Sequence, residues 1–226
     1  MWGGGSISVR LVVALCGFLV GASVSASADD TASPSYDAIL SQLKSGFTDI
    51  DYGQLRDAYA ASPGYDPYFR GGQDEKELTE GLKNSDCQKV LSAANRMLDA
   101  NFTNITAHVY ASACSSRLND VSSAQYHRKV AQGLLGSIAR SGTGEEPQSA
   151  FVVVSVDEEY AFLATRGYRI LDQSLVQYGA HECEAIEAVD ETGVKKTVYF
   201  NVDRPWAWLA HKFPPKSDTK PSAPAH

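Results

Sequence analysis

Three consecutive carboxylates, Asp157, Glu158 and Glu159, could supply paired acids for a hydrolytic reaction centred on His181. Such chemistry requires His181 to converge with Glu158 or Glu159, because a general acid or base must lie within hydrogen-bond reach of the proton that it transfers. The simpler interpretation is that Asp157 caps a short helix and that both glutamates interact favourably with the helix dipole. We keep the hydrolase as the alternative hypothesis and assign no residue as catalytic.

A set of polar residues on neighbouring predicted strands is the better candidate for a ligand-binding site. Its members are Gln173, His181, Tyr199, Asn201 and Asp203. If they share one face of a sheet, and helices leave that face uncovered, they form a hydrogen-bonding groove for a polar ligand. The alternative interpretation is a solvated sheet face that binds nothing.

Motifs for metals and cofactors are missing from the sequence. The five histidines are scattered, with neither a His-x-x-x-His pair nor a Cys-x-x-Cys pair. No phosphate-binding loop and no dinucleotide-binding glycine pattern follows a predicted strand. We therefore predict no metal and no cofactor.

Residues 1–28 have the parts of a cleavable signal peptide. Arg10 precedes the apolar run Leu11–Val24, and Ala26, Ser27 and Ala28 supply small residues at the cleavage position. The run is shorter than the roughly 20 residues that a membrane-spanning helix needs. The sequence thus predicts an exported bacterial protein, periplasmic or secreted, that is not stably inserted in the membrane after cleavage.

Removal of this segment leaves 19 Lys and Arg against 27 Asp and Glu, a net charge near −8. An acidic chain of this kind argues against nucleic acid or an anionic membrane as a partner. Three cysteines remain, an odd number, so at most one disulfide forms. Cys87 and Cys114 fall on successive predicted helices and could pair if these helices pack antiparallel; the alternative is two buried thiols.

Residues 29–144 form a predicted helical region, because apolar residues recur at helical spacing from Tyr36 to Arg140. Asp86 is expected to cap a helix. The 34 residues from Asp86 to Asn119 resemble a single tetratricopeptide-type helix–turn–helix unit. Concave helical surfaces of this type bind peptides, and the alternative is a plain helical bundle without a groove.

Residues 145–212 form a predicted α+β region, a small and mostly antiparallel sheet with one helix. The continuous apolar run Phe151–Val154 is expected to be a central strand with neighbours on both sides. A helix opened by Asp157 follows, and then come three strands over 168–178, 181–189 and 194–202.

The end of the sequence is expected to contribute no further core. Pro205–Leu209 is predicted to fold back over a sheet edge or a helix face. The Pro, Ser and Lys content of residues 213–226 predicts a disordered tail.

Several short runs resemble an exported bacterial family known only as domain of unknown function number 4919, of which some members are described as tetratricopeptide-containing. The runs are Ile50–Tyr52, Tyr65–Phe69, Ser141–Gly144, Ala150–Val154, Glu158–Tyr160, Gln173–Leu175 and Tyr199–Asp203. The chain departs from the family pattern at Thr143, where an acidic residue is typical, and at Cys183-Glu184, where a Tyr-Asp pair is typical. The resemblance implies export and a fold, and it carries no activity and no catalytic residue.

Taken together, the residues favour a periplasmic or secreted binding or interaction protein without catalytic activity. Its partner would be an unidentified protein, a peptide or a polar small ligand. The hydrolase using His181 with Glu158 or Glu159 is the alternative.

Overall fold

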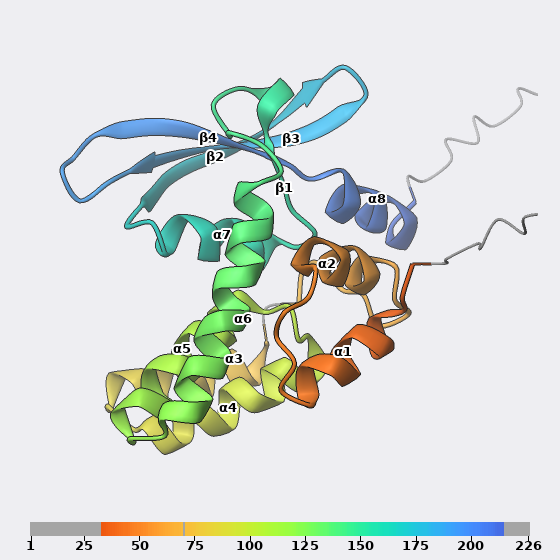
Figure 1. Cartoon of the computed structure of the whole chain (residues 1–226). Helices are drawn as coiled ribbons and strands as arrows, with labels where there is room; N and C mark the ends of the chain where they lie inside the picture. The colour runs from red at the N-terminus through yellow and green to blue at the C-terminus, as the bar shows by residue number, and fades with distance from the viewer. Residues whose placement is uncertain (1–32, 70, 215–226) are drawn as a thin grey trace, which may run out of the picture. The chain divides into compact units, whose positions relative to one another are not determined.

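The computed structural model describes residues 33–69 and 71–214, which fall within one compact unit. The predicted signal peptide and all but the first two residues of the predicted tail lie outside the described residues. Six helices come first in the chain, and they are α1 (Tyr36–Lys44), α2 (Tyr52–Ala60), α3 (Gln73–Lys83), α4 (Cys87–Ala100), α5 (Ile105–Arg117) and α6 (Val121–Ala139). The later elements are the 3-10 helix η1 (Pro147–Ser149), β1 (Phe151–Val152), α7 (Val156–Ala164), β2 (Arg169–Tyr178), β3 (His181–Val189), β4 (Lys195–Asn201) and α8 (Asp203–Lys212) (Figure 1).

Short polar side chains set where most of the first six helices begin. Asp51 accepts hydrogen bonds from the amides of Gly53 and Gln54, and Asp86 accepts one from the amide of Lys89. Asn104 and Asp120 cap α5 and α6 in the same way. These caps satisfy amides that have no partner inside the helix, so the helix boundaries follow from the local sequence. The predicted N-cap role of Asp86 is confirmed.

A disulfide joins α4 to α5. Cys87 is the first residue of α4 and Cys114 lies near the end of α5, with their Cα atoms 5.0 Å apart, so the two helices are antiparallel. The remaining described cysteine, Cys183, is a buried free thiol. The helix–turn–helix predicted over residues 86–119 corresponds to α4 and α5, and its likeness to a tetratricopeptide repeat stays a prediction.

The sheet has the strand order β1-β4-β3-β2. β3 pairs antiparallel with both β2 and β4, and β1 is parallel to β4, so the sheet is mixed. Ile186, Val198 and Phe200 are buried on the face that carries α7 and α8 (Figure 1). The predicted α+β class, with helices preceding a small sheet, is confirmed.

The central strand predicted at Phe151–Val154 is wrong. β1 contains only Phe151 and Val152 and lies at one edge of the sheet, beside β4. Val153 and Val154 leave the sheet on the way to α7 and are fully buried. The apolar run therefore reflects burial against the helices. The ring of Phe151 takes part in this packing, since its centroid lies 4.6 Å from that of Phe162 in α7.

The segment predicted to fold back at Pro205–Leu209 is helical. α8 begins at Asp203 with Pro205 in its first turn, where a missing amide hydrogen removes no helical hydrogen bond. The α+β region therefore has two α-helices rather than the single predicted one. Among the described residues, no helix has the length and apolar character needed to cross a membrane.

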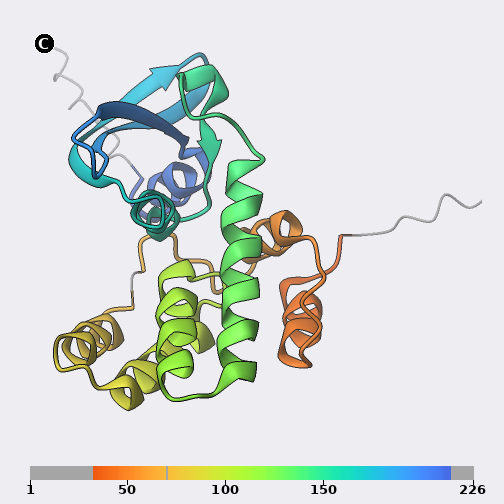
Figure 2. The same ribbon diagram turned by 60° about the vertical axis from the view of Figure 1, so that its left-hand side comes forward.

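Helix α6 runs from the helical region up to the sheet and packs against α2 (Figure 2). The approach is closest at Gly133, where an added Cβ would lie 2.2 Å from Cε2 of Tyr52. Glycine at this position is therefore a packing requirement, although it lowers intrinsic helix propensity.

We predict that Gly133→Ala lowers the free energy of unfolding by about 1–3 kcal/mol, because the methyl group overlaps a buried ring. Gly136→Ala on the same helix is the matched control, since its Cβ would meet only the flexible end of Arg140 at 3.2 Å. The control should be neutral or stabilising by up to about 1 kcal/mol, as helix propensity dictates. Urea unfolding measures both, and equal effects of the two substitutions would contradict this packing.

Candidate functional site

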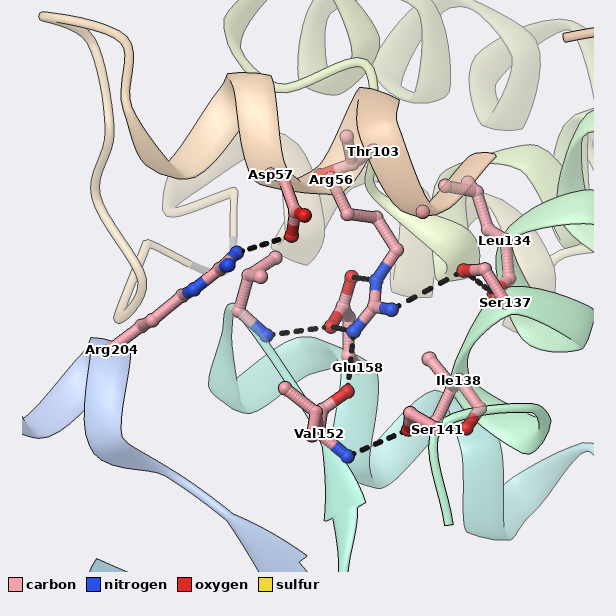
Figure 3. A network of polar contacts seen from close by, with 12 residues as sticks. Arg56, Asp57, Thr103, Leu134, Ser137, Ile138, Ser141, Val152, Glu158 and Arg204 are labelled. Atoms are coloured by element: carbon pink, nitrogen blue, oxygen red, sulfur yellow. Dashed lines mark hydrogen bonds and ion pairs between the residues drawn. The ribbon is translucent and has the colours of Figure 1, made fainter. Parts of the chain in front are cut away.

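A buried ion pair joins α2 to α7. Nε and Nη2 of Arg56 each donate to one carboxylate oxygen of Glu158, both at 2.7 Å (Figure 3). The residues are 4% and 0% exposed. A two-pronged contact of this kind matches the planar guanidinium to the planar carboxylate and is the strong form of a salt bridge.

The same two side chains also satisfy backbone groups around them. Arg56 donates to the carbonyl of Val152 at 2.6 Å and to the hydroxyl of Ser137 at 3.3 Å. The Glu158 carboxylate accepts from the amide of Val154 at 2.8 Å. The network therefore connects α2, α6, α7 and the segment that follows β1 (Figure 3). Glu158 is fully engaged as a structural anion.

Asp157 is not the N-cap of α7, contrary to the prediction. The N-cap position belongs to Ser155, and Asp157 lies inside the first turn, where it accepts a hydrogen bond from the hydroxyl of Thr106 at 3.2 Å. Both glutamates lie in the first turn as expected, but they are completely buried. The first turn of α7 packs against α5, so Asp157 bonds to Thr106 of that helix instead of capping α7.

Glu159 forms a carboxyl pair with Glu184 of β3. When Glu159 is ionised, neither of its side-chain oxygens receives a hydrogen bond from an N–H or O–H group of the protein. Burial first, and then the hydrogen bond and negative charge of Glu184, raise the pKa of Glu159 well above its ordinary value. Protonation of Glu159 removes the repulsion that its buried carboxylate would otherwise have with Glu184.

Gln173 is hydrogen-bonded to Glu184 of this carboxyl pair. It donates to Glu184 at 2.9 Å and accepts from the hydroxyl of Tyr160 at 2.6 Å. Its cross-strand partner is Ile186, whose side chain is buried beneath α7 and α8. Gln173 therefore points to the helix-covered face of the sheet.

His181, Asn201 and Asp203 form a separate cluster where β3 begins and β4 ends. One carboxylate oxygen of Asp203 accepts from His181 Nδ1 at 2.6 Å and from Asn201 at 3.0 Å, and the other accepts from the amide of Glu182 at 2.8 Å. Burial opposes the charged form of Asp203, but these hydrogen bonds outweigh it and lower its pKa. The arrangement fixes the start of α8 and leaves the His181 side chain 59% exposed.

The five predicted ligand-binding residues therefore do not share one face. Tyr199 and Asn201 lie on the sheet face opposite Gln173, as their pairing with Ala185 and Cys183 shows. This second face carries the loop around η1, where the thiol of Cys183 lies 3.8 Å from the carbonyl of Pro147. Alternation along β3 also directs His181 and Glu184 to opposite faces.

The hydrolase alternative gains no support from these contacts. His181 is hydrogen-bonded to Asp203, whereas Glu158 is held by Arg56 and Glu159 by Glu184. The convergence of His181 with Glu158 or Glu159 that such an enzyme requires stays a prediction.

A histidine pair that sequence spacing does not reveal lies between α5 and α6. Nδ1 of His108 and Nδ1 of His127 are 2.9 Å apart, and Nε2 of His108 bonds to the carbonyl of Phe102 at 2.9 Å. Burial lowers the pKa of His108 to about 3, so this ring is neutral at physiological pH. Within residues 33–69 and 71–214, no group of three or more His, Cys, Asp or Glu is placed to hold a metal ion.

A groove of about 800 Å³ lies between α1, α2 and the turn that follows α2. We call it the α1–α2 groove, and its lining residues include Tyr36, Asp37, Asp51, Asp57, Tyr59 and Pro63. The rings of Tyr36 and Tyr59 contact each other at 5.5 Å between centroids.

Comparison with family profiles assigns the chain. Residues 24–209 match the profile of the family described as Domain of unknown function (DUF4919). The chain belongs to this family. Comparisons with curated proteins and with solved structures find no match.

The buried ion pair gives a testable stability prediction. Arg56→Met or Glu158→Gln alone should each lower the free energy of unfolding by about 3–5 kcal/mol, because an unpaired buried charge or donor remains. The double variant should lose less than the sum, with a coupling above about 1 kcal/mol. The exposed pair Lys89–Glu80 is the control, for which coupling should stay below about 1 kcal/mol. Additive losses at Arg56 and Glu158 in urea unfolding would refute the pair's importance.

The carboxyl pair gives a pH prediction. Because the pKa of Glu159 is raised in the folded state, folding takes up a proton, and stability is lost as pH rises from about 4.3, the unfolded value, through the raised folded value. Glu159→Gln should abolish this loss and make the protein more stable than the parent above pH 7. Thermal unfolding from pH 4 to 9 measures the slope, with the exposed Glu187→Gln as control. Parallel pH profiles for all three proteins would be inconsistent with the buried pair.

Proposed function

We propose that the protein is an exported binding protein, periplasmic or secreted, which holds a positively charged, extended peptide segment in the α1–α2 groove and performs no catalysis. The observation that carries the proposal is the groove itself. Its volume of about 800 Å³ falls within the 300–1,000 Å³ typical of ligand sites. The signal-peptide features of residues 1–28 support export.

The walls of the groove are already in place. The hydroxyl of Tyr36 accepts a hydrogen bond from the amide of Phe102 at 3.1 Å, and Tyr59 is 2% exposed and packs edge-on against Tyr65 at 5.4 Å. Asp51 is held by its capping bonds to α2. Preformed walls lose little conformational entropy when a ligand binds, which favours affinity.

The charge of the groove defines the ligand. Asp37, Asp51 and Asp57 contribute carboxylates, and the described lining includes no Lys, Arg or His. Burial raises the pKa of Tyr59 to about 12, so its phenol is neutral and the carboxylates alone set the potential. Arg204 approaches Asp57 from α8 at 2.5 Å and neutralises part of that charge. Lysine or arginine side chains of a ligand would complement the remainder.

The shape favours an extended segment. Parts of α1 and α2 and the Pro63-Gly64 turn line a groove that is partly open to solvent, and two tyrosine residues belong to its lining. Aromatic-lined grooves recognise proline-containing extended peptides, because such peptides are preordered before binding. A cationic proline-containing peptide is therefore the probe that fits best.

We predict that a fluorescein-labelled peptide of sequence Lys-Pro-Ala-Lys-Pro-Ala binds the protein lacking residues 1–28, and that the Glu-for-Lys counterpart does not. Asp37→Lys should weaken binding at least about fivefold, the equivalent of one lost surface charge contact of about 1 kcal/mol. Glu145→Lys makes the same charge change outside the groove and should have little effect. Fluorescence anisotropy at two salt concentrations measures the affinities. Equal binding of the two peptides, or no binding of either, would overturn the proposal.

A further inference from the structure

Strand β2 ends the sheet with a long free edge. It has ten residues, and it is the last strand in the order β1-β4-β3-β2, so no described strand pairs with its outer side. Leu175 is 48% exposed and Tyr178 is 44% exposed. An exposed edge strand with large apolar side chains is a template for pairing with another chain. We propose that β2 pairs with β2 of a second copy, which joins the two four-stranded sheets into one.

The hydrogen bonds of β3 show which backbone groups of β2 face outward. The amide of Val202 donates to the carbonyl of Glu182 at 2.9 Å, so Glu182 directs its backbone toward β4. Backbone direction alternates along an antiparallel strand, so His181 and Cys183 direct their backbone groups toward their partners on β2. The outward groups of β2 therefore belong to the residues that alternate with these partners, which are Gln173, Leu175 and Gln177.

The chain protects one end of this edge and leaves the other end open. A register shift between Ile170 and Asp172 interrupts the pairing with β3, and bulges of this kind turn an edge away from other strands. The carboxylate of Asp172 also accepts a hydrogen bond from the outward amide of Gln173 at 2.9 Å. The sequence has no charged residue and no proline from Gln173 to the turn at Gly179. The open part of the edge is therefore Ser174–Tyr178.

These limits select one register. Two copies that use the same surface are related by a two-fold axis, so the two strands run antiparallel. An axis at Val176 places Leu175 opposite Gln177 of the second copy, and the symmetry repeats this pair. The outward amides and carbonyls of both residues are then satisfied, and the bond between Gln173 and Asp172 is kept. An axis nearer the start of the strand would require the Gln173 amide for pairing.

The side chains are compatible with this register. Val176 lies opposite Val176 of the second copy in a non-hydrogen-bonded pair, where Cα atoms are about 4.5 Å apart and β-branched side chains pack well. On the other face, the exposed Leu175 lies over Gln177 of the second copy. Like charges do not meet, because Ser174–Tyr178 has no charged residue.

The geometry of the sheet favours a closed pair of copies over a chain of them. β1, at the opposite edge, has only two residues, so the strand that a second copy can offer is β2. Pairing of β2 with itself uses both edges and closes at two copies. The paired stretch is shorter than the roughly 20–30 residues a side of a standard interface, so the dimer is expected to be weak and reversible.

Analytical ultracentrifugation of the protein lacking residues 1–28 tests the dimer. Between about 5 and 500 µM, the range suited to a small interface, the average mass should rise from one copy toward two. Leu175→Lys should weaken the dimer at least about tenfold, because it places a cation on the pairing edge. Val194→Lys, at an exposed apolar residue before β4, makes the same change away from this edge and should have no effect. A monomeric parent, or equal dimerisation of the two variants, would overturn the proposal.

Cysteine cross-linking tests the register in a Cys183→Ala background, which removes the thiol opposite Val176 within the same sheet. Val176→Cys should form a disulfide-linked dimer on mild oxidation, because the two Cα atoms lie within disulfide range. Leu171→Cys, at the bulged end of β2, should stay unlinked because the two copies of this residue lie far apart. Equal cross-linking of both variants, or of neither, would also overturn the proposal. Neither result bears on the α1–α2 groove, since no β2 residue lines it.

Discussion

The ion pair between Arg56 and Glu158 is the interaction on which the placement of helices α1–α6 relative to the sheet and α7 depends. A buried guanidinium and a buried carboxylate are each very unfavourable unless the other is present in the right geometry. Both lie at the meeting point of α2, α6 and α7, and their spare donors and acceptors bind the backbone of Val152 and Val154. Displacement of the sheet region from the helices would separate the two charges and leave the carbonyl of Val152 without its Arg56 donor, while Val154 would keep its bond to Glu158. The pair thus makes the relative placement of α2 and α7 specific.

Fixing Glu158 also fixes what its neighbour does. Consecutive residues on a helix point about 100° apart, so a helix that directs Glu158 toward Arg56 must direct Glu159 elsewhere. In α7 that direction is toward the sheet, where Glu184 and Gln173 lie on the same face. The acid pair is therefore a consequence of the helix geometry and the salt bridge together. Burial of Glu159 beside Glu184 favours the protonated form of Glu159.

Features that depend on the local sequence pattern were predicted correctly. Features that depend on how distant elements pack against each other were missed. Asp86 as a cap and the strands expected over 168–178, 181–189 and 194–202 follow from local sequence, and the structure has the cap and all three strands. The edge position of β1 could not be read from Phe151–Val154, because apolar runs record burial and not the number of neighbouring strands. Arg56 has no sequence signal, since a single arginine on a short helix usually faces solvent. The five predicted ligand-binding residues do not share a face, because residues on three strands were grouped without knowledge of the strand register. In that register, Gln173 and Asn201 lie on different faces of the sheet.

The α1–α2 groove shares helix α2 with the buried ion pair, since Asp57 and Tyr59 line the groove and Arg56 bonds to Glu158. α1 and α2 are nine-residue helices held by tyrosine contacts and by α8, while the rigid pairing of α4 with α5 and of β3 with its neighbours lies elsewhere. Three carboxylates line this one concavity, and Arg204 contacts only Asp57. Asp37 and Asp51 are therefore the groove carboxylates on which the proposed recognition of a positively charged chain rests.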